Sequence, residues 1–197
     1  MTQFAIVRHG VTDWNVEGRM QGHRDIPLNE AGIIQAARIA ERLQQEHWDV
    51  VVFSDLQRAA QTAACIAETI GIECRIGDPR LRERNFGKLE GTTIEERMDR
   101  WGTDWKQLDH GVEGEELLLS RALNCMEEFS NEYSKQKIVI VTHGGWIRQF
   151  FKGVFPHDVL DHPNNTSLSI VNRRAEGWQC SLYNCTKHLN TDQNILG

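Results

Sequence analysis

Phe4-Ala5-Ile6-Val7-Arg8-His9-Gly10 runs from four apolar residues into a basic pair and a glycine. Two later stretches share this order: Val50-Val51-Val52-Phe53 before Ser54, and Ile138-Val139-Ile140-Val141 before Thr142-His143-Gly144-Gly145. Short, continuous apolar runs bounded by turn residues are typical of strands that are buried on both faces of a parallel sheet. We therefore predict strands over 4–7, 50–53 and 138–141, each followed at once by polar residues.

Helical patterns lie between these strands. Apolar residues recur near helical spacing over 30–45 and 55–70, and further helices are predicted over about 115–132 and from near Trp146. Near the C-terminus, Ser167–Val171 and Trp178–Tyr183 are predicted strands, joined by a polar turn over 172–177. Because strands alternate with helices, we predict an α/β fold: a three-layer α/β/α sandwich with a mainly parallel sheet.

Two details of the first two helices are also predicted. Ser54 and Gln57 have the spacing of a capping box, which places Arg58 in the first turn of the second helix. The apolar stripe of the first helix is assigned to Ile33, Ile34, Ala37, Ala40 and Leu43.

Composition limits the class of protein. The 197 residues suffice for one domain with a sizeable core, and 40% hydrophobic with 25% charged residues is usual for a soluble globular protein. The net charge of -6 argues against nucleic acid or an anionic membrane as the main partner. The apolar run before Arg8 is only four residues long, so no signal peptide is predicted, and no apolar stretch is long enough for a membrane span. We expect a cytoplasmic protein.

The five cysteines point the same way. They are odd in number and contain no C-x-x-C pair, which favours reduced thiols in the cytosol over a disulfide framework. None follows a strand in a glycine-rich turn, so burial as small hydrophobic residues is favoured over nucleophilic catalysis.

The segment 86–114 fits the alternating pattern poorly. It is polar, punctuated by glycines, and contains Trp101 and Trp105. It is interpreted either as a lid over the active site, with the two tryptophans lining an apolar part of the pocket, or as a surface excursion. We predict a single domain over 1–197 with a lid-like insertion at about 86–114, and a loose tail after His188.

Two histidines follow strands in matching contexts. His9 and His143 each come directly after a buried apolar run and directly before a glycine, and carboxyl ends of parallel strands meet at one edge of a sheet. A neutral imidazole is a competent nucleophile towards phosphorus, and the guanidinium of Arg8 can orient a phosphate by paired hydrogen bonds. A single histidine at a strand end is more often structural, but two in this arrangement favour a common catalytic site.

An arginine and a carboxylate complete the set. Arg58 is predicted in the first turn of a helix, where free N–H groups also attract an anion, although a surface arginine is the alternative. Hydrolysis of a phosphate ester needs a proton donor for the leaving oxygen and later a base for water. The residues alone do not separate Glu83 from Glu90 or Glu95 for this role.

Together these residues resemble the histidine phosphatase superfamily, the group that includes cofactor-dependent phosphoglycerate mutases and many small phosphatases. The resemblance covers almost the whole chain. The motifs that carry it are Ile6-Val7-Arg8-His9-Gly10, Gly18-Arg19-Met20-Gln21-Gly22, Ser54-Asp55-Leu56-Gln57-Arg58-Ala59, Leu81 with Glu83, Phe86-Gly87 and Glu90-Gly91, and Val141-Thr142-His143-Gly144-Gly145.

The resemblance implies a phosphoglycerate mutase-like fold and a role for each matching position. It makes His9 the nucleophile that becomes phosphorylated and Glu83 the proton donor and base. It implies no metal and no cofactor, and its substrate is a small phosphate monoester. The phosphate-binding residues that it implies are Arg8, Arg58, His143 and Asn15, with Gln21 and Gly22 beside the substrate.

Four functions remain open at this stage. Only 60 positions separate Glu83 from His143, whereas the glycolytic mutases carry an insertion there, so a phosphatase is favoured over a phosphoglycerate mutase. An inactive relative that binds phosphorylated partners is disfavoured by the intact residue set. A metal-dependent hydrolase is the fourth reading, which activity that survives a chelator would exclude. The natural substrate and the oligomeric state are not predicted.

Overall fold

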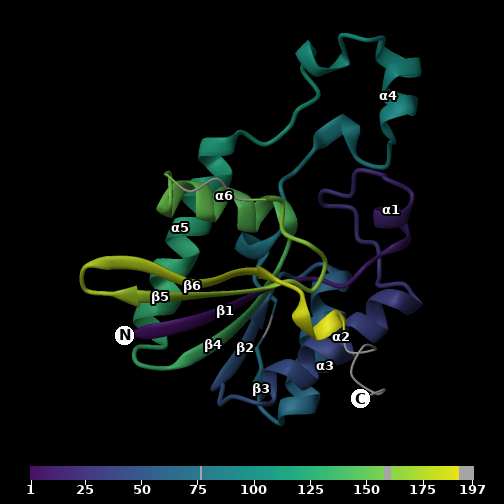
Figure 1. Ribbon diagram of the computed structural model, residues 1–197. Helices are drawn as coiled ribbons and strands as arrows, with labels where there is room; N and C mark the ends of the chain where they lie inside the picture. The colour runs from purple at the N-terminus through teal and green to yellow at the C-terminus, as the bar shows by residue number, and fades with distance from the viewer. Residues whose placement is uncertain (76, 158–160, 191–197) are drawn as a thin grey trace.

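A central sheet organises the molecule. The computed structural model describes residues 1–75, 77–157 and 161–190 (Figure 1). Its sheet has the order β3-β2-β4-β1-β5-β6. The first four strands in this order are parallel to one another, and β5 and β6 are antiparallel additions at one edge. The strands are β1 (Thr2–Arg8), β2 (Val50–Phe53), β3 (Glu73–Cys74), β4 (Lys137–Thr142), β5 (Leu168–Arg174) and β6 (Gly177–Cys185).

Helices cover both faces of the sheet. The pair α2 (Glu30–Leu43) and α3 (Gln57–Ile70) packs on one face, and α5 (Glu115–Glu132) and α6 (Gly144–Val154) pack on the other (Figure 1). This arrangement confirms the three-layer sandwich. The short elements are α1 (Asp13–Val16), α4 (Ile94–Trp101) and the 3-10 turns η1 (Pro79–Leu81), η2 (Gly87–Leu89), η3 (Trp105–Gln107) and η4 (Lys187–Leu189). Within the described residues, no helix has the length and apolar character needed to cross a membrane.

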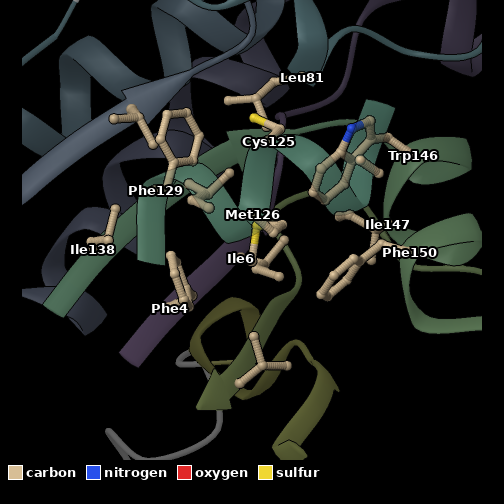
Figure 2. Close-up of a cluster of buried hydrophobic side chains, with 14 of the residues drawn as sticks. Phe4, Ile6, Leu81, Cys125, Met126, Phe129, Ile138, Trp146, Ile147 and Phe150 are labelled. Atoms are coloured by element: carbon tan, nitrogen blue, oxygen red, sulfur yellow. The ribbon is translucent and has the colours of Figure 1, made fainter. Parts of the chain in front are cut away.

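The central strands are apolar throughout because both of their faces are buried. On β1, Ala5 and Val7 pack against α2 and α3, whereas Phe4 and Ile6 point to the other layer, where they meet Met126 of α5 (Figure 2). Each fully buried Val, Ile, Phe or Met side chain stabilises the fold by roughly 1.5–3 kcal/mol. Burial on alternate faces accounts for the unbroken apolar runs seen in the sequence.

The strand register brings three polar residues to one edge. Arg8 of β1 pairs with Thr142 of β4, and Phe53 of β2 pairs with Val141. His9 and His143 are therefore the next residues of neighbouring strands. Ser54 follows β2 at the same level, because its N–H donates to the Val141 carbonyl at 2.9 Å.

The apolar stripe predicted for α2 was only partly correct. Ala40 and Leu43 are buried, but Ile33 and Ile34 are 58% and 57% exposed, and Ala37 is exposed as well. Small residues face inward near the helix start because α2 lies very close to the turn after β1. The residues of α2 that are buried are Gly32, Ala36, Ile39, Ala40 and Leu43.

The capping box predicted for α3 was wrong. The helix begins at Gln57 with Leu56 as N-cap, and no side chain of the N-cap residue caps it. Asp25 from a distant loop takes that role, since its carboxylate accepts from the Gln57 N–H at 2.6 Å. Ser54 instead faces His143. The prediction that Arg58 lies in the first turn of α3 is confirmed.

The C-terminal hairpin and the cysteines also differ in detail from expectation. The antiparallel strands are longer than predicted, so that the turn is confined to 175–176 rather than 172–177. Only Cys125 is buried, and Cys74 is exposed. None of the five cysteines, all of which lie within the described residues, forms a disulfide. The tail expected after His188 falls mainly on 191–197, which lie outside the described residues.

Residues 86–114 leave the body of the molecule as an arm that carries α4 (Figure 1). Trp105 is buried within this arm, where the Arg97 guanidinium lies 5.1 Å from its ring centroid. Trp101 packs on His110 with a centroid distance of 4.7 Å. The two tryptophans therefore form a small core for the arm itself.

Candidate active site

A cavity of about 170 Å³ lies at the carboxyl ends of β1, β2 and β4. It brings together seven of the eight residues singled out from the sequence. The eighth, His143, lies behind His9, with a distance of 5.0 Å between the ring centroids. The lining residues are Arg8, His9, Asn15, Arg19, Met20, Gln21, Gly22, Arg58, Glu83, Phe86, Gly145 and His162.

His9 is held in one orientation at the end of β1. Its backbone N–H donates to the Thr142 carbonyl at 2.9 Å, and its ring Nδ1 lies 2.7 Å from the Gly10 carbonyl oxygen. A carbonyl only accepts, so Nδ1 carries the proton and Nε2 keeps a free lone pair. Burial, and then the positive charges of Arg58 and Arg8, hold the pKa of His9 well below its usual range. The ring is therefore neutral at pH 7, as a nucleophile must be.

Gly10 allows α2 to lie very close to the end of β1. A Cβ added at this position would lie 2.5 Å from the Gly32 carbonyl oxygen of α2. The glycine therefore permits close packing between the β1 turn and α2, in addition to the sharp turn that follows the strand.

His143 is completely buried, and one side of its ring is anchored. Nε2 lies 2.8 Å from the Ser54 hydroxyl, whereas Nδ1 has no hydrogen-bond partner among the described residues. The Ser54 oxygen also accepts from the Leu56 N–H at 3.4 Å, and its hydroxyl has one proton of its own that it can donate to a ring nitrogen. When Ser54 donates to Nε2, Nδ1 must carry the ring proton and can donate it to an oxygen. Burial, followed by the charge of Arg58, keeps the pKa of His143 well below its usual range.

Two guanidiniums supply positive charge, that of Arg58, which is buried, and that of Arg8, which is half-buried. One terminal nitrogen of Arg8 donates to the Pro163 carbonyl at 2.7 Å, and those of Arg58 donate to the Gly22 and Arg24 carbonyls at 2.8 Å. The Nε atoms of both arginines are buried without a partner among the described residues. Burial lowers the pKa of Arg58 to about 10, so it remains charged at pH 7. Two such charges with unused donors favour an anion in the cavity.

Glu83 faces this cavity from the segment that follows η1. Its carboxylate accepts N–H bonds from Gly145 at 3.0 Å and Trp146 at 3.1 Å, both in the first turn of α6, and from Arg84 at 2.8 Å. Its backbone carbonyl accepts from Arg121 at 2.9 Å and from the His23 ring at 2.8 Å. The helix terminus thus fixes the carboxylate in place.

The structure separates Glu83 from the two alternatives. The Glu90 carboxylate accepts from the His23 and Phe86 N–H groups at 2.9 and 3.1 Å and does not line the cavity. Glu95 is exposed on α4. Of the three carboxylates that the sequence left open, only Glu83 lines the cavity.

The three remaining predicted residues, Asn15, Gln21 and Gly22, also line the cavity. Asn15 forms a capping box with Thr12, and its Oδ1 lies 3.4 Å from Asn165 Nδ2. The buried Oε1 of Gln21 has no partner among the described residues. Gly22 has φ +55°, and an added Cβ would overlap the Glu90 carboxylate, so a larger residue there would adopt a strained backbone and displace Glu90.

Sequence reasoning missed several contributors. His162, in the loop before β5, lines the cavity, and Asn165 donates to the His9 carbonyl at 3.0 Å. Arg19, Met20 and Phe86 also line it, although Arg19 and Met20 lie in the motif around Gln21. Trp101 and Trp105, which were considered as lining residues, are absent from the wall. No group of three or more histidine, cysteine, aspartate or glutamate side chains in the described part of the chain could hold a metal ion.

Comparison with known proteins places this geometry in a family. The model of the histidine phosphatase superfamily (branch 1) matches residues 4–186. A metal-independent phosphoserine phosphatase of Arabidopsis thaliana is 31% identical over 97% of this chain and 84% of its own length. Probable phosphoglycerate mutases also match, one of them from Yersinia pestis at 34% identity over 92% of this chain and 89% of its own.

Solved structures of similar proteins have the same fold as this chain. YhfR of Bacillus stearothermophilus superposes with a TM-score of 0.87 at 26% identity, covering 96% of this chain and all of its own. A mycobacterial glucosyl-3-phosphoglycerate phosphatase superposes with a TM-score of 0.83 at 27% identity, over 93% of this chain and 99% of its own.

Proposed function

Because the chain belongs to the histidine phosphatase superfamily and is a phosphoric monoester hydrolase, we propose that it hydrolyses small phosphate monoesters through a phosphohistidine on His9. The observation that carries this assignment is the neutral His9 ring, whose Nδ1 is tied to the Gly10 carbonyl so that Nε2 faces the reaction unprotonated. The guanidiniums of Arg8 and Arg58 also line the cavity, and their Nε atoms are buried with no partner among the described residues.

The first half-reaction transfers the phosphoryl group to the enzyme. The Nε2 lone pair of His9 forms a bond to phosphorus while the bond from phosphorus to the ester oxygen breaks. Glu83 gives its proton to that oxygen, and the alcohol leaves. Charge that develops on the three equatorial oxygens is stabilised by Arg8, Arg58 and the Nδ1 proton of His143, which are already in place before reaction.

The second half-reaction restores the enzyme. Water attacks phosphorus opposite the His9 nitrogen and passes a proton to the Glu83 carboxylate. The bond between Nε2 and phosphorus breaks, and its electron pair returns to the ring. Inorganic phosphate then leaves, with Glu83 protonated and His9 neutral for the next cycle.

We assign the segment 86–114 as a lid-like insertion in a single domain. Phe86 at its base lines the cavity, and Arg19 of the wall forms an ion pair with Glu96 of α4 at 2.9 Å, which links the arm to the site. Cytoplasmic location, metal independence and the lack of a nucleic-acid partner remain predictions from the sequence. The oligomeric state is not assigned.

The decisive experiment replaces the nucleophile. His9→Ala should abolish phosphate release from p-nitrophenyl phosphate, and wild-type enzyme quenched during turnover should carry an acid-labile phosphoryl group on His9. His47→Ala is the matched control, since that histidine is exposed and pairs only with Asp49. Retained turnover in a folded His9→Ala variant would overturn the proposal.

The same samples separate a phosphatase from a mutase. The machinery described above can return the phosphoryl group to a sugar acid instead of to water, and relatives named as probable mutases match the chain. We expect phosphate release from 3-phosphoglycerate to exceed its conversion to 2-phosphoglycerate. The reverse ratio would assign the mutase activity.

A further inference from the structure

The short segment that carries Glu83 is held in place by side chains of other elements. Glu83 itself belongs to neither a helix nor a strand, and each carbonyl from residue 80 to 83 accepts a hydrogen bond from a side chain. The Leu81 carbonyl accepts from the Thr142 hydroxyl at 2.7 Å, and the Arg80 carbonyl accepts from the Trp146 ring N–H at 2.9 Å. Three of these four carbonyls also accept from a single residue of α5, Arg121.

Arg121 uses all five of its N–H donors. One terminal nitrogen donates to the Arg80 and Arg82 carbonyls at 2.8 and 2.7 Å, and the other donates to the Glu83 carbonyl at 2.9 Å. The two remaining N–H groups bind the Glu113 carboxylate as a bidentate pair, at 2.8 and 3.0 Å. Because a guanidinium is rigid and planar, these bonds fix the three carbonyls relative to one another.

Glu113 orients this guanidinium at the base of the arm. Only 10% of its side chain is exposed, and 18% of that of Arg121. The Glu113 N–H donates to the Asn85 carbonyl at 2.8 Å, and the Asn85 N–H donates to the Glu113 carboxylate at 3.1 Å, so the two ends of the arm are joined here. Although burial opposes ionisation, the hydrogen bonds from Arg121 and Asn85 lower the pKa of Glu113, and its carboxylate is charged at pH 7.

Glu83 is thus fixed at two points by helices of one layer. N–H groups at the start of α6 hold its carboxylate, and Arg121 of α5 holds its carbonyl. Neither Arg121 nor Glu113 lines the cavity, so neither contacts a phosphate bound there. A reacting group that is displaced by about 1 Å loses on the order of a hundredfold in rate, even when the cause lies far from the reacting atoms.

We propose that Arg121 and Glu113 are positioning residues for Glu83, which act on catalysis by fixing the backbone that carries the proton donor. This inference rests on the proposed function. A pair that only stabilised the fold would, when removed, reduce the activity equally for every substrate. A positioning pair acts on the step that Glu83 performs, so the effect of its removal depends on whether the leaving group needs a proton.

Two esters with different leaving groups test the proposal. Arg121→Met retains most of the side-chain length but removes all five donors. Its kcat for glycerol 3-phosphate, whose alkoxide must be protonated, should fall by about ten- to a hundredfold. Its kcat for p-nitrophenyl phosphate, whose leaving group departs without a proton, should fall by less than about threefold. KM for p-nitrophenyl phosphate should stay unchanged, because the cavity wall is intact.

Three further variants define the cause. Arg121→Lys keeps the charge but has three donors in place of five, so its ratio of kcat for the two esters should lie between those of wild type and Arg121→Met. Glu113→Gln removes only the negative charge of the pair and should show a smaller loss with the same dependence on the leaving group. Arg173→Met is the control, since it breaks another ion pair of α5, that with Glu127 at 3.0 Å, and should leave the ratio unchanged.

A double variant shows whether Arg121 acts through Glu83. In Glu83→Gln the proton donor is already absent, so adding Arg121→Met should not change the ratio of kcat for the two esters any further. A change in the ratio that persists in this background would overturn the inference, because Arg121 would then act on another group.

The remaining outcomes separate this inference from the proposed function. Equal losses for both esters in Arg121→Met, Arg121→Lys and Glu113→Gln would show that the pair is structural, while a selective loss in Glu83→Gln would leave the proposed function standing. If Glu83→Gln itself affects both esters equally, the acid step of the proposed function fails, and this inference fails with it.

Discussion

Arg58 and Arg97 are both almost completely buried, yet the protein uses them differently. Arg97, in the arm, donates Nε to the Thr92 hydroxyl at 2.8 Å and a terminal nitrogen to the Thr92 carbonyl at 2.7 Å. Arg58, in the cavity wall, spends its terminal nitrogens on loop carbonyls and leaves Nε without a partner among the described residues. Leaving a buried donor unpaired costs roughly 1–3 kcal/mol. An unpaired buried donor is explained if an anion binds beside it and accepts its hydrogen bond.

The same contrast extends to the surroundings of each arginine. Around Arg58, buried atoms of Arg8, Gln21 and His143 also have no partner in the described part of the chain. Around Arg97, the His110 ring lies 2.6 Å from the Trp105 carbonyl, and the guanidinium stacks over the Trp105 ring. Polar groups of the cavity are therefore available to bind a ligand, whereas those around Arg97 form hydrogen bonds within the arm.

Glu83→Gln should give the largest effect and tests whether the cavity is chemically active rather than merely charged. The amide cannot supply the leaving-group proton, so kcat for glycerol 3-phosphate should fall about a thousandfold. The loss should be much smaller for p-nitrophenyl phosphate, because its leaving group departs without a proton. Steady-state kinetics on both esters measure this difference.

A neighbouring carboxylate gives the matched control for that experiment. Glu90→Gln alters a residue that accepts from the His23 and Phe86 N–H groups and does not line the cavity. Any loss that it causes should be equal for the two esters. Equal losses for both esters in Glu83→Gln would exclude a proton-transfer role.

Ser54→Ala should give the next largest effect. We assign Ser54 as a positioning residue, which acts by donating to His143 Nε2 and so keeping the proton on Nδ1. Without it the wrong tautomer becomes accessible, and kcat should fall by about one to two orders of magnitude, the scale of one or two charge-assisted hydrogen bonds. KM for p-nitrophenyl phosphate should change much less.

Rescue distinguishes tautomer control from simple destabilisation. Ser54→Thr retains the hydroxyl and should recover most of kcat, even though its extra methyl group crowds a fully buried site. If Ser54→Ala and Ser54→Thr lose kcat in proportion to their thermal stability alone, Ser54 is structural and His143 needs no orienting partner.

The burial of His9 and His143 in and behind the cavity should also appear in the pH dependence of the free energy of unfolding. His9 and His143 have pKa values held well below the usual 6.5 in the folded state, first by burial. Below pH 6.5 the unfolded chain therefore binds protons that the folded chain refuses, and the free energy of unfolding falls as the pH falls. Each such histidine contributes a slope of about 1.4 kcal/mol per pH unit.

Urea unfolding at pH 7 and pH 5.5 measures this loss. The slope should decrease in His9→Gln, which removes one of the two buried rings, and remain unchanged in His47→Gln, whose ring is exposed. Identical slopes for wild type and His9→Gln would show that the cavity tolerates a charged imidazole, contrary to the nucleophile assignment.

The residues of the cavity also differ in how far the sequence predicts their roles. The residues at strand ends were predictable because a continuous apolar run defines its own end, and parallel register then brings His9 next to His143. By contrast, Ser54 has the spacing of a capping residue, but its hydroxyl forms a hydrogen bond with His143. The N–H of Gln57 at the start of α3 donates to the Asp25 carboxylate instead. Local spacing does not reveal a competitor from a distant loop.

Other placements could not be predicted because they depend on loops without periodicity or on tertiary packing. His162 lines the cavity, but nothing in its flanking residues distinguishes it from a surface position. Phe86 also lines the cavity, and although it belongs to a motif of the resemblance, no role at the site followed from that motif. The exposed Ile33 and Ile34 show the same limit in reverse, because the close approach of α2 to the β1 turn buries the smaller residues instead. These placements depend on tertiary packing, which outweighs local pattern.

Arg97→Ala tests the arm and should give the smallest catalytic effect. Losing the bonds to Thr92 and the stacking on Trp105 removes the internal support of the arm, so amide exchange over 92–110 should accelerate. Since the arm reaches the site through Phe86 and the pairing of Arg19 with Glu96, the KM for p-nitrophenyl phosphate should rise only a few-fold and kcat should hold. Arg100→Ala, an exposed position on the same helix, is the control and should leave exchange nearly unchanged. A loss of kcat comparable to that of Glu83→Gln would mean that the arm shares in the chemistry. Arg97, whose Nε is paired, would then support catalysis as directly as Arg58, whose Nε has no partner among the described residues.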